Sequence, residues 1–129
     1  MRLSNKWNPE PDLFVVLPEK YNKLKETHFE GPADLVIEIL SKSTMEIDTK
    51  KKLPEYLASG VKEVWIVNPM EEKISIHTKE EIIDYTKDEQ EAEIESKVLP
   101  ELRIKVKWIW KRAEYPTSAI IREMIKRGK

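Results

Sequence analysis

The chain has 129 residues, of which 40% are hydrophobic and 36% charged, and its formal net charge is −1 at pH 7. This length supports one hydrophobic core, so we expect a single domain over residues 1–129. The near-zero net charge gives no general attraction to nucleic acid or membranes. The sequence has no cysteine, which excludes disulfides and cysteine zinc sites, and no apolar stretch approaches the roughly 20 residues of a membrane span. We therefore expect a cytoplasmic protein.

Two strands are predicted first. Residues 13–17 form a continuous apolar run between two prolines, which is typical of a short buried strand. A polar segment follows, for which we expect a loop with one helical turn. Residues 34–40 (DLVIEIL) are rich in branched apolar side chains and too short for an average helix, which predicts a central strand. Alternation places Asp34 and Glu38 on one face of that strand.

A helix and a hairpin are predicted next. Residues 45–59 carry apolar side chains at helical spacing, and Gly60 is the expected C-cap. Because Pro54 removes a backbone hydrogen bond, we expect the helix to bend there or to begin properly at Pro54 after one irregular turn. Residues 61–67 and 73–77 predict an antiparallel hairpin.

The C-terminal part predicts smaller elements. Residues 81–85 and 93–98 are candidates for short edge strands. Residues 102–110 alternate as a strand does, although VKWIW at 106–110 is equally consistent with a short helical turn. A basic helix is predicted over about 116–127, because a proline stands at its first position and cations fill its last turn.

Three charged residues are candidates for a catalytic site. Asp12 stands at the start of the first strand, Glu38 lies inside the second, and Lys52 lies in the helix after it. A buried carboxylate costs several kcal/mol unless it is paired or holds a metal. Two carboxylates can hold Mg²⁺ against a phosphate, and a lysine can neutralise the charge that develops during phosphodiester hydrolysis. The alternatives are a turn or strand-start cap for Asp12 and a solvated helix face for Lys52. For Glu38 they are an edge-strand glutamate that faces solvent or a buried pair with a lysine.

The order of these motifs resembles a known family. The pieces are Pro11-Asp12, ADLVIEILS at 33–41, D-x-x-x-K-x-x-x-Y at Asp48, Lys52 and Tyr56, and GVKEVWIVNP at 60–69. Together they resemble the restriction-endonuclease-like domain family of the PD-(D/E)xK nuclease superfamily, from about residue 11 through the strand at 74. The resemblance implies an α/β fold with a mixed sheet flanked by helices, Mg²⁺-dependent or Mn²⁺-dependent cleavage of DNA, and a homodimer.

The resemblance also assigns roles to individual residues. Asp12 matches the aspartate of the PD motif and Glu38 the glutamate of the ExK element, so both would be metal ligands. The lysine expected two positions after that glutamate is absent, because position 40 is Leu40. Lys52 on the following helix is the expected substitute as a catalytic residue. Asp34 is a further candidate, as an auxiliary ligand or supporting acid.

Members of this family usually carry another helix and strand ahead of the PD motif. Only eleven residues precede Asp12 here. The sequence therefore predicts that these elements are missing and that a sheet edge is left for a partner subunit to cover.

The sequence leaves three functions open. The first is a metal-dependent deoxyribonuclease in which Asp12 and Glu38 bind Mg²⁺ and Lys52 assists the attack of water. The second is a catalytically inactive nuclease-like module that acts as a dimeric binding or scaffold unit. The third is a small structural α/β protein whose acids form surface ion pairs, a hypothesis that burial of Glu38 excludes.

Overall fold

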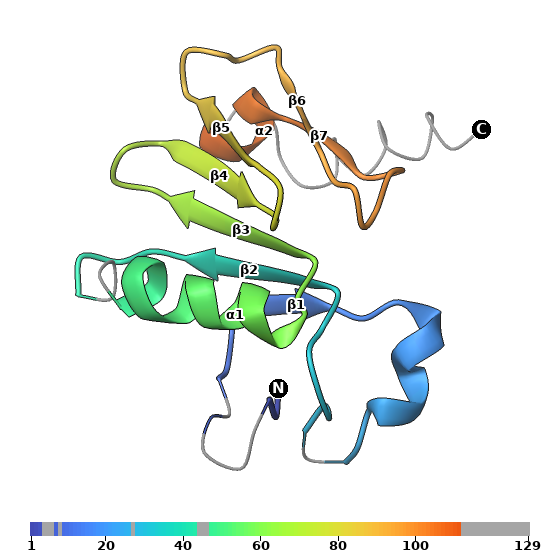
Figure 1. Cartoon of the computed structure of the whole chain (residues 1–129). Helices are drawn as coiled ribbons and strands as arrows, with labels where there is room; N and C mark the ends of the chain where they lie inside the picture. Colours follow the sequence, from blue (N-terminus) through green and yellow to red (C-terminus); the bar gives the residue numbers. More distant parts are fainter. Residues whose placement is uncertain (4–6, 8, 27, 44–46, 112–129) are drawn as a thin grey trace. The chain divides into compact units, whose positions relative to one another are not determined.

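The computed structural model describes residues 1–3, 7, 9–26, 28–43 and 47–111 (Figure 1). The chain divides into two compact units, Met1–Asp84 and Tyr85–Lys129. The basic helix predicted at 116–127 lies outside the described residues.

A five-stranded sheet with the order β1-β2-β3-β4-β5 organises the first unit. β2 and β3 are parallel, whereas β1 pairs antiparallel with β2 and β4 antiparallel with β3. This mixed sheet confirms the predicted α/β class and the predicted hairpin. The strands are β1 (Leu13–Val15), β2 (Leu35–Ile39), β3 (Glu63–Asn68), β4 (Lys73–His77) and β5 (Ile82–Thr86).

The connection from β2 to β3 shows what Pro54 does. A π-helix, η2 (Ile47–Lys52), comes first, and the α-helix α1 (Leu53–Ser59) follows it. Pro54 lies in the first turn of α1, where its missing N–H has no helical partner to lose. The second of the two expectations, an irregular turn followed by a regular helix, is confirmed. Gly60 ends α1 with φ at 107°, a left-handed conformation that glycine adopts without strain.

One face of the sheet packs against α1 and the N-terminal segment. Alternate residues of β2 and β3 point to this face, and they are fully or almost fully buried. Glu38 belongs to the same alternating set of β2 and points to the same face. The hydrophobic cluster here consists of Met1, Phe29, Ala33, Val36, Leu40, Tyr56, Val61, Val64 and Ile66.

The opposite face of the central strands is also buried. Leu35, Trp65, Ile74 and Ile76 are at most 3% exposed. Burial on both faces explains why β2 and β3 appear in the sequence as nearly continuous apolar runs. Glu63 is buried among these side chains and accepts a hydrogen bond from the Trp65 indole N–H at 3.1 Å.

The second unit contains a two-stranded antiparallel sheet and one short helix. Its elements are β6 (Glu93–Glu95), β7 (Arg103–Lys105) and α2 (Val106–Trp110). The strand predicted across 102–110 is therefore wrong after residue 105, and the helical alternative for VKWIW holds. Val106 begins the helix while its N–H donates to the carbonyl of Ala92 at 3.0 Å, and its side chain is fully buried.

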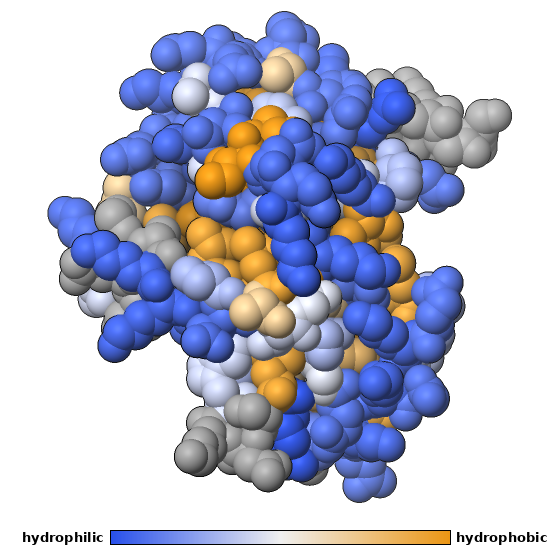
Figure 2. Space-filling view, viewed as in Figure 1, coloured by the Kyte–Doolittle hydropathy of each residue, from blue (hydrophilic) through white to orange (hydrophobic). Residues whose placement is uncertain are grey.

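Hydrophilic residues dominate the face shown in Figure 2, and apolar residues gather in a few patches between them. This distribution agrees with the 36% of charged residues in the sequence. Within the described part of the chain, no helix combines the length and the apolar character needed to cross a bilayer.

Candidate active site

Pairing of β1 with β2 brings Asp12 level with Glu38. Leu13 lies opposite Ile37 in this antiparallel pair, so the residues one step further out lie opposite each other on the other face. Asp12 is exposed, and its Oδ2 accepts a hydrogen bond from the Ile39 N–H at 2.7 Å. The backbone positions of two predicted site residues therefore lie opposite each other at one end of the sheet.

Glu38 is buried, with 2% of its surface exposed. The Tyr56 hydroxyl donates a hydrogen bond to its Oε1 at 2.7 Å. The ammonium nitrogen of Lys52 lies 3.8 Å from its Oε2, and the lysine side chain is 27% exposed. The predicted lysine thus reaches the predicted glutamate from the next helical segment. Because Glu38 is buried, the hypothesis that these acids are merely surface ion pairs is wrong.

The chemistry of this donor set suits a hard cation. Mg²⁺ is commonly held by one or two carboxylates and keeps several waters, so Asp12 and Glu38 fit it without a third acid. Among the described residues, no group of three or more histidine, cysteine, aspartate or glutamate side chains is arranged to hold a metal. The side chain of Asp48, which the motif also contains, lies outside the described part of the structure.

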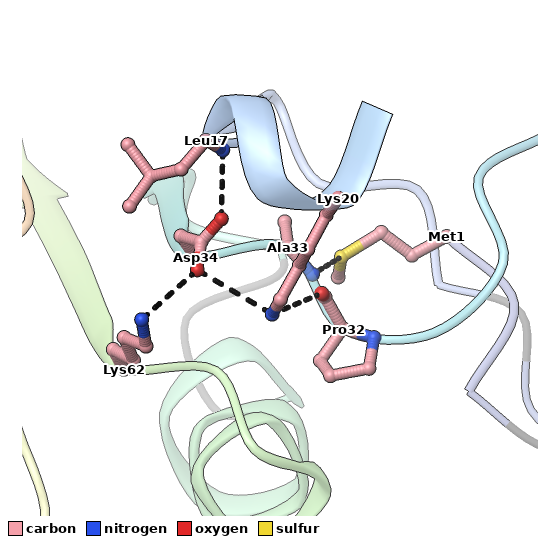
Figure 3. A network of polar contacts seen from close by, with 7 residues as sticks. All are labelled: Met1, Leu17, Lys20, Pro32, Ala33, Asp34 and Lys62. Carbon is pink, nitrogen blue, oxygen red and sulfur yellow. Dashed lines mark hydrogen bonds and ion pairs between the residues drawn. The ribbon is translucent and has the colours of Figure 1, made fainter. Parts of the chain in front are cut away.

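Asp34 belongs to a different network of polar contacts, with Leu17, Lys20 and Lys62 (Figure 3). It precedes Glu38 by four positions, which corresponds to about 13 Å along an extended strand. Its Oδ2 accepts a hydrogen bond from the Leu17 N–H at 2.7 Å, and the ammonium groups of Lys20 and Lys62 each lie 3.4 Å from its Oδ1. The structure does not bring Asp34 to the site, and its auxiliary role stays a prediction.

These contacts control the charge of Asp34. Burial raises its pKa, but the Leu17 N–H and the two lysines stabilise the carboxylate, and the net effect lowers the pKa below the ordinary value of 3.8. Lys20 belongs to the 3-10 helix η1 (Pro18–Lys23) and also donates to the Pro32 carbonyl at 3.1 Å. Asp34 therefore ties η1 to the start of β2 (Figure 3).

Sequence reasoning missed two features, one at the site and one on the opposite face of the sheet. Tyr56 was recognised in the motif, but its hydrogen bond to Glu38 was not predicted. Glu63 is a second carboxylate buried in the sheet, and its signal was an acid inside the apolar run VKEVWIV, the same kind of signal that singled out Glu38.

Comparison with known proteins agrees with this fold. Residues 1–107 match the model of the Uma2 family, described as "Putative restriction endonuclease". Among solved structures, the chain resembles the crystal structure of "a putative nuclease belonging to DUF820" from Anabaena variabilis, with a TM-score of 0.66 and 22% sequence identity. No curated protein matches the sequence.

The likeness to that crystal structure covers 78% of this chain and 59% of the other, so the chain spans about three fifths of that protein's length. At 22% identity, this likeness supports the fold alone. The family match extends over more than four fifths of the sequence and includes every predicted site residue. The chain therefore belongs to the Uma2 family of restriction-endonuclease-like domains.

Proposed function

We propose that this protein is a metal-dependent endonuclease of the PD-(D/E)xK type that hydrolyses phosphodiester bonds in DNA. The observation that carries the proposal is that Asp12 stands opposite Glu38 in the pairing of β1 with β2, while Lys52 forms an ion pair with Glu38. Membership in a family of restriction-endonuclease-like domains supports the same reaction class.

Asp12 and Glu38 would hold Mg²⁺, or Mn²⁺ in its place. When bound, such an ion polarises a phosphate oxygen and makes water a better nucleophile. Burial of Glu38 strengthens its electrostatic interaction with any cation, because fewer waters screen the charge. Lys52 is partly exposed, so its ammonium group can turn from Glu38 toward a substrate phosphate and neutralise charge there.

We further propose that the protein acts as a homodimer. β1 is one of the two edge strands of the sheet and has only three residues. Leu13 on β1 and Ile39 on β2 point to the same face, and they are 54% and 52% exposed. An apolar edge of this kind favours pairing with another copy. Light scattering coupled to size exclusion should give twice the mass of one chain, and a Leu13→Glu variant should give the single mass.

The test of the nuclease proposal is cleavage of supercoiled plasmid by the purified protein with Mg²⁺ or Mn²⁺. We expect the parent to nick the plasmid and Glu38→Ala to be inactive. Lys52→Met should lose most activity, whereas the exposed neighbour Lys51→Met should cleave as the parent does. Equal cleavage by Glu38→Ala and the parent would contradict the proposal.

A second function is a nuclease-like module that binds without cleaving. It is favoured by the small donor set, because the described residues supply only two carboxylates at the site and one oxygen of Asp12 already accepts the Ile39 N–H. This function predicts no cleavage with any divalent ion while binding of labelled DNA persists. The same plasmid assay, joined to a DNA-binding titration, therefore separates the two functions.

A further inference from the structure

The two oxygens of Glu38 have different surroundings. Oε1 faces the Tyr56 hydroxyl at 2.7 Å, and the tyrosine is fully buried. Oε2 faces the ammonium group of Lys52 at 3.8 Å, a distance longer than a hydrogen bond, and this lysine is partly exposed. One oxygen therefore faces a fully buried side chain, and the other faces a side chain that reaches the surface.

Tyr56 is held rigidly. It lies on α1, its side chain belongs to the hydrophobic cluster, and its ring centroid is 5.4 Å from that of Trp7. Its carbonyl accepts the Val61 N–H at 3.0 Å, just after the helix end at Gly60. A buried hydroxyl that donates to a carboxylate forms a strong, charge-assisted hydrogen bond. The tyrosine thus fixes the rotation of the Glu38 carboxylate.

We infer that Tyr56 is a positioning residue that makes Glu38 a one-oxygen ligand and thereby favours Mg²⁺ over Ca²⁺ at this site. The inference rests on the proposed function, because it requires a cation at Asp12 and Glu38. A cation that takes the place of the Lys52 ammonium group meets Oε2 first, while Oε1 stays with the tyrosine hydroxyl.

The two ions differ in what they require from such a ligand. Mg²⁺ demands a small octahedral shell, usually built from one or two carboxylates and several waters. Ca²⁺ takes six to eight oxygens and often binds both oxygens of one glutamate. Because Oε1 is turned toward the tyrosine and one of its lone pairs accepts that hydroxyl, the two-oxygen mode of Glu38 is disfavoured. The affinity for Ca²⁺ is therefore reduced, whereas the affinity for Mg²⁺ is unchanged.

The test uses Tyr56→Phe, which removes the hydroxyl and keeps the buried ring. Titration calorimetry should give Kd values for MgCl₂ and CaCl₂ with the parent, with this variant and with Tyr21→Phe. Tyr21 is 60% exposed and serves as the matched control. We expect the parent to bind Mg²⁺ more tightly than Ca²⁺. In Tyr56→Phe, the preference for Mg²⁺ should fall about tenfold, as expected when a residue that orients a ligand is lost, and Tyr21→Phe should match the parent.

The variant Lys52→Met distinguishes the positioning of Glu38 by Tyr56 from a change in the charge around Glu38. Removal of the ammonium group should tighten both ions by a similar factor and leave their ratio unchanged, because the hydroxyl remains. An unchanged ratio in Tyr56→Phe would overturn the inference while the nuclease proposal stands. Tighter binding of Ca²⁺ by the parent would overturn it without any variant. A parent that binds neither ion would overturn both the inference and the metal-dependent function.

Discussion

Asp34 and Glu38 are two buried carboxylates of the same strand segment, and they differ in their partners. Asp34 contacts one backbone N–H and two ammonium groups, each at 3.4 Å or less. Among its contacts, Glu38 accepts a hydrogen bond from a hydroxyl at 2.7 Å and has an ammonium group at 3.8 Å. The difference teaches that burial alone does not identify an acid as a candidate metal ligand. The closeness of the neighbouring cations also affects whether the acid can accept another.

The origin of the partners explains this difference. The partners of Asp34 come from η1 and from the residue before β3, so the carboxylate joins segments that are distant in the sequence. The Tyr56 hydroxyl and the Lys52 ammonium group that contact Glu38 come from the connection between β2 and β3, and Lys52 is partly exposed. Asp34 therefore has the features of a structural tie, whereas Glu38 has those of the metal ligand proposed above.

The largest expected effect is on activity. Glu38→Gln keeps the shape of the side chain and an acceptor for the Tyr56 hydroxyl, but it removes the negative charge. We expect plasmid cleavage in Mg²⁺ to fall at least about a thousandfold, because a bound metal supplies several kcal/mol of transition-state stabilisation. Asp34→Asn should stay within a few fold of the parent at a temperature where it is folded. Similar losses of cleavage activity in both variants would contradict the distinction between a structural Asp34 and a metal-binding Glu38.

The next effect is on stability. Asp34→Asn keeps an acceptor for the Leu17 N–H but removes the negative charge that the two lysines share. We expect the free energy of unfolding to fall by about 2–4 kcal/mol. Urea denaturation followed by circular dichroism measures this quantity. A loss below about 0.5 kcal/mol would show that the tie contributes little.

The smallest effect is on the dependence of stability on pH. Because the pKa of Asp34 is lowered in the folded state, its contribution is fully present above the ordinary value of 3.8 and is lost as the pH falls through the lowered pKa. The difference in unfolding free energy between the parent and Asp34→Asn should therefore be constant from pH 7 to about 5 and shrink at pH 3. Urea titrations at these values test it. Other acids titrate in both proteins and cancel in the difference. A gap that widens in acid would contradict the pKa direction.

Much of the fold could be predicted from the sequence because its strongest signals are local. The apolar runs predicted the strands of the sheet. Pro54 predicted where the regular helix begins, and Gly60 predicted where it ends. Each of these depends on backbone chemistry that holds in nearly any surroundings. The VKWIW segment shows the limit, since five residues satisfy both a strand and a helix pattern until tertiary contacts choose.

The candidate site was only partly predictable. Alternation gave the face shared by Asp34 and Glu38, but four strand positions correspond to about 13 Å, so a shared face grouped two acids that the structure separates. The lysine partners of Asp34 come from segments 14 positions earlier and 28 positions later in the sequence. The hydroxyl contact of Tyr56 depends on how α1 packs on β2. Contacts of this kind follow from the fold and cannot be predicted from sequence spacing.

The hydrogen bond between Asp12 and the Ile39 N–H has a consequence for folding fidelity. β1 pairs with β2 through only three residues, so few contacts oppose a slip of one position. Such a slip would turn every β1 side chain to the wrong face. It would also detach Asp12 from the Ile39 N–H and move it away from Glu38. The Asp12 hydrogen bond therefore favours the native register of β1 on β2. A chain with the wrong register would lose both this hydrogen bond and the arrangement of the candidate site.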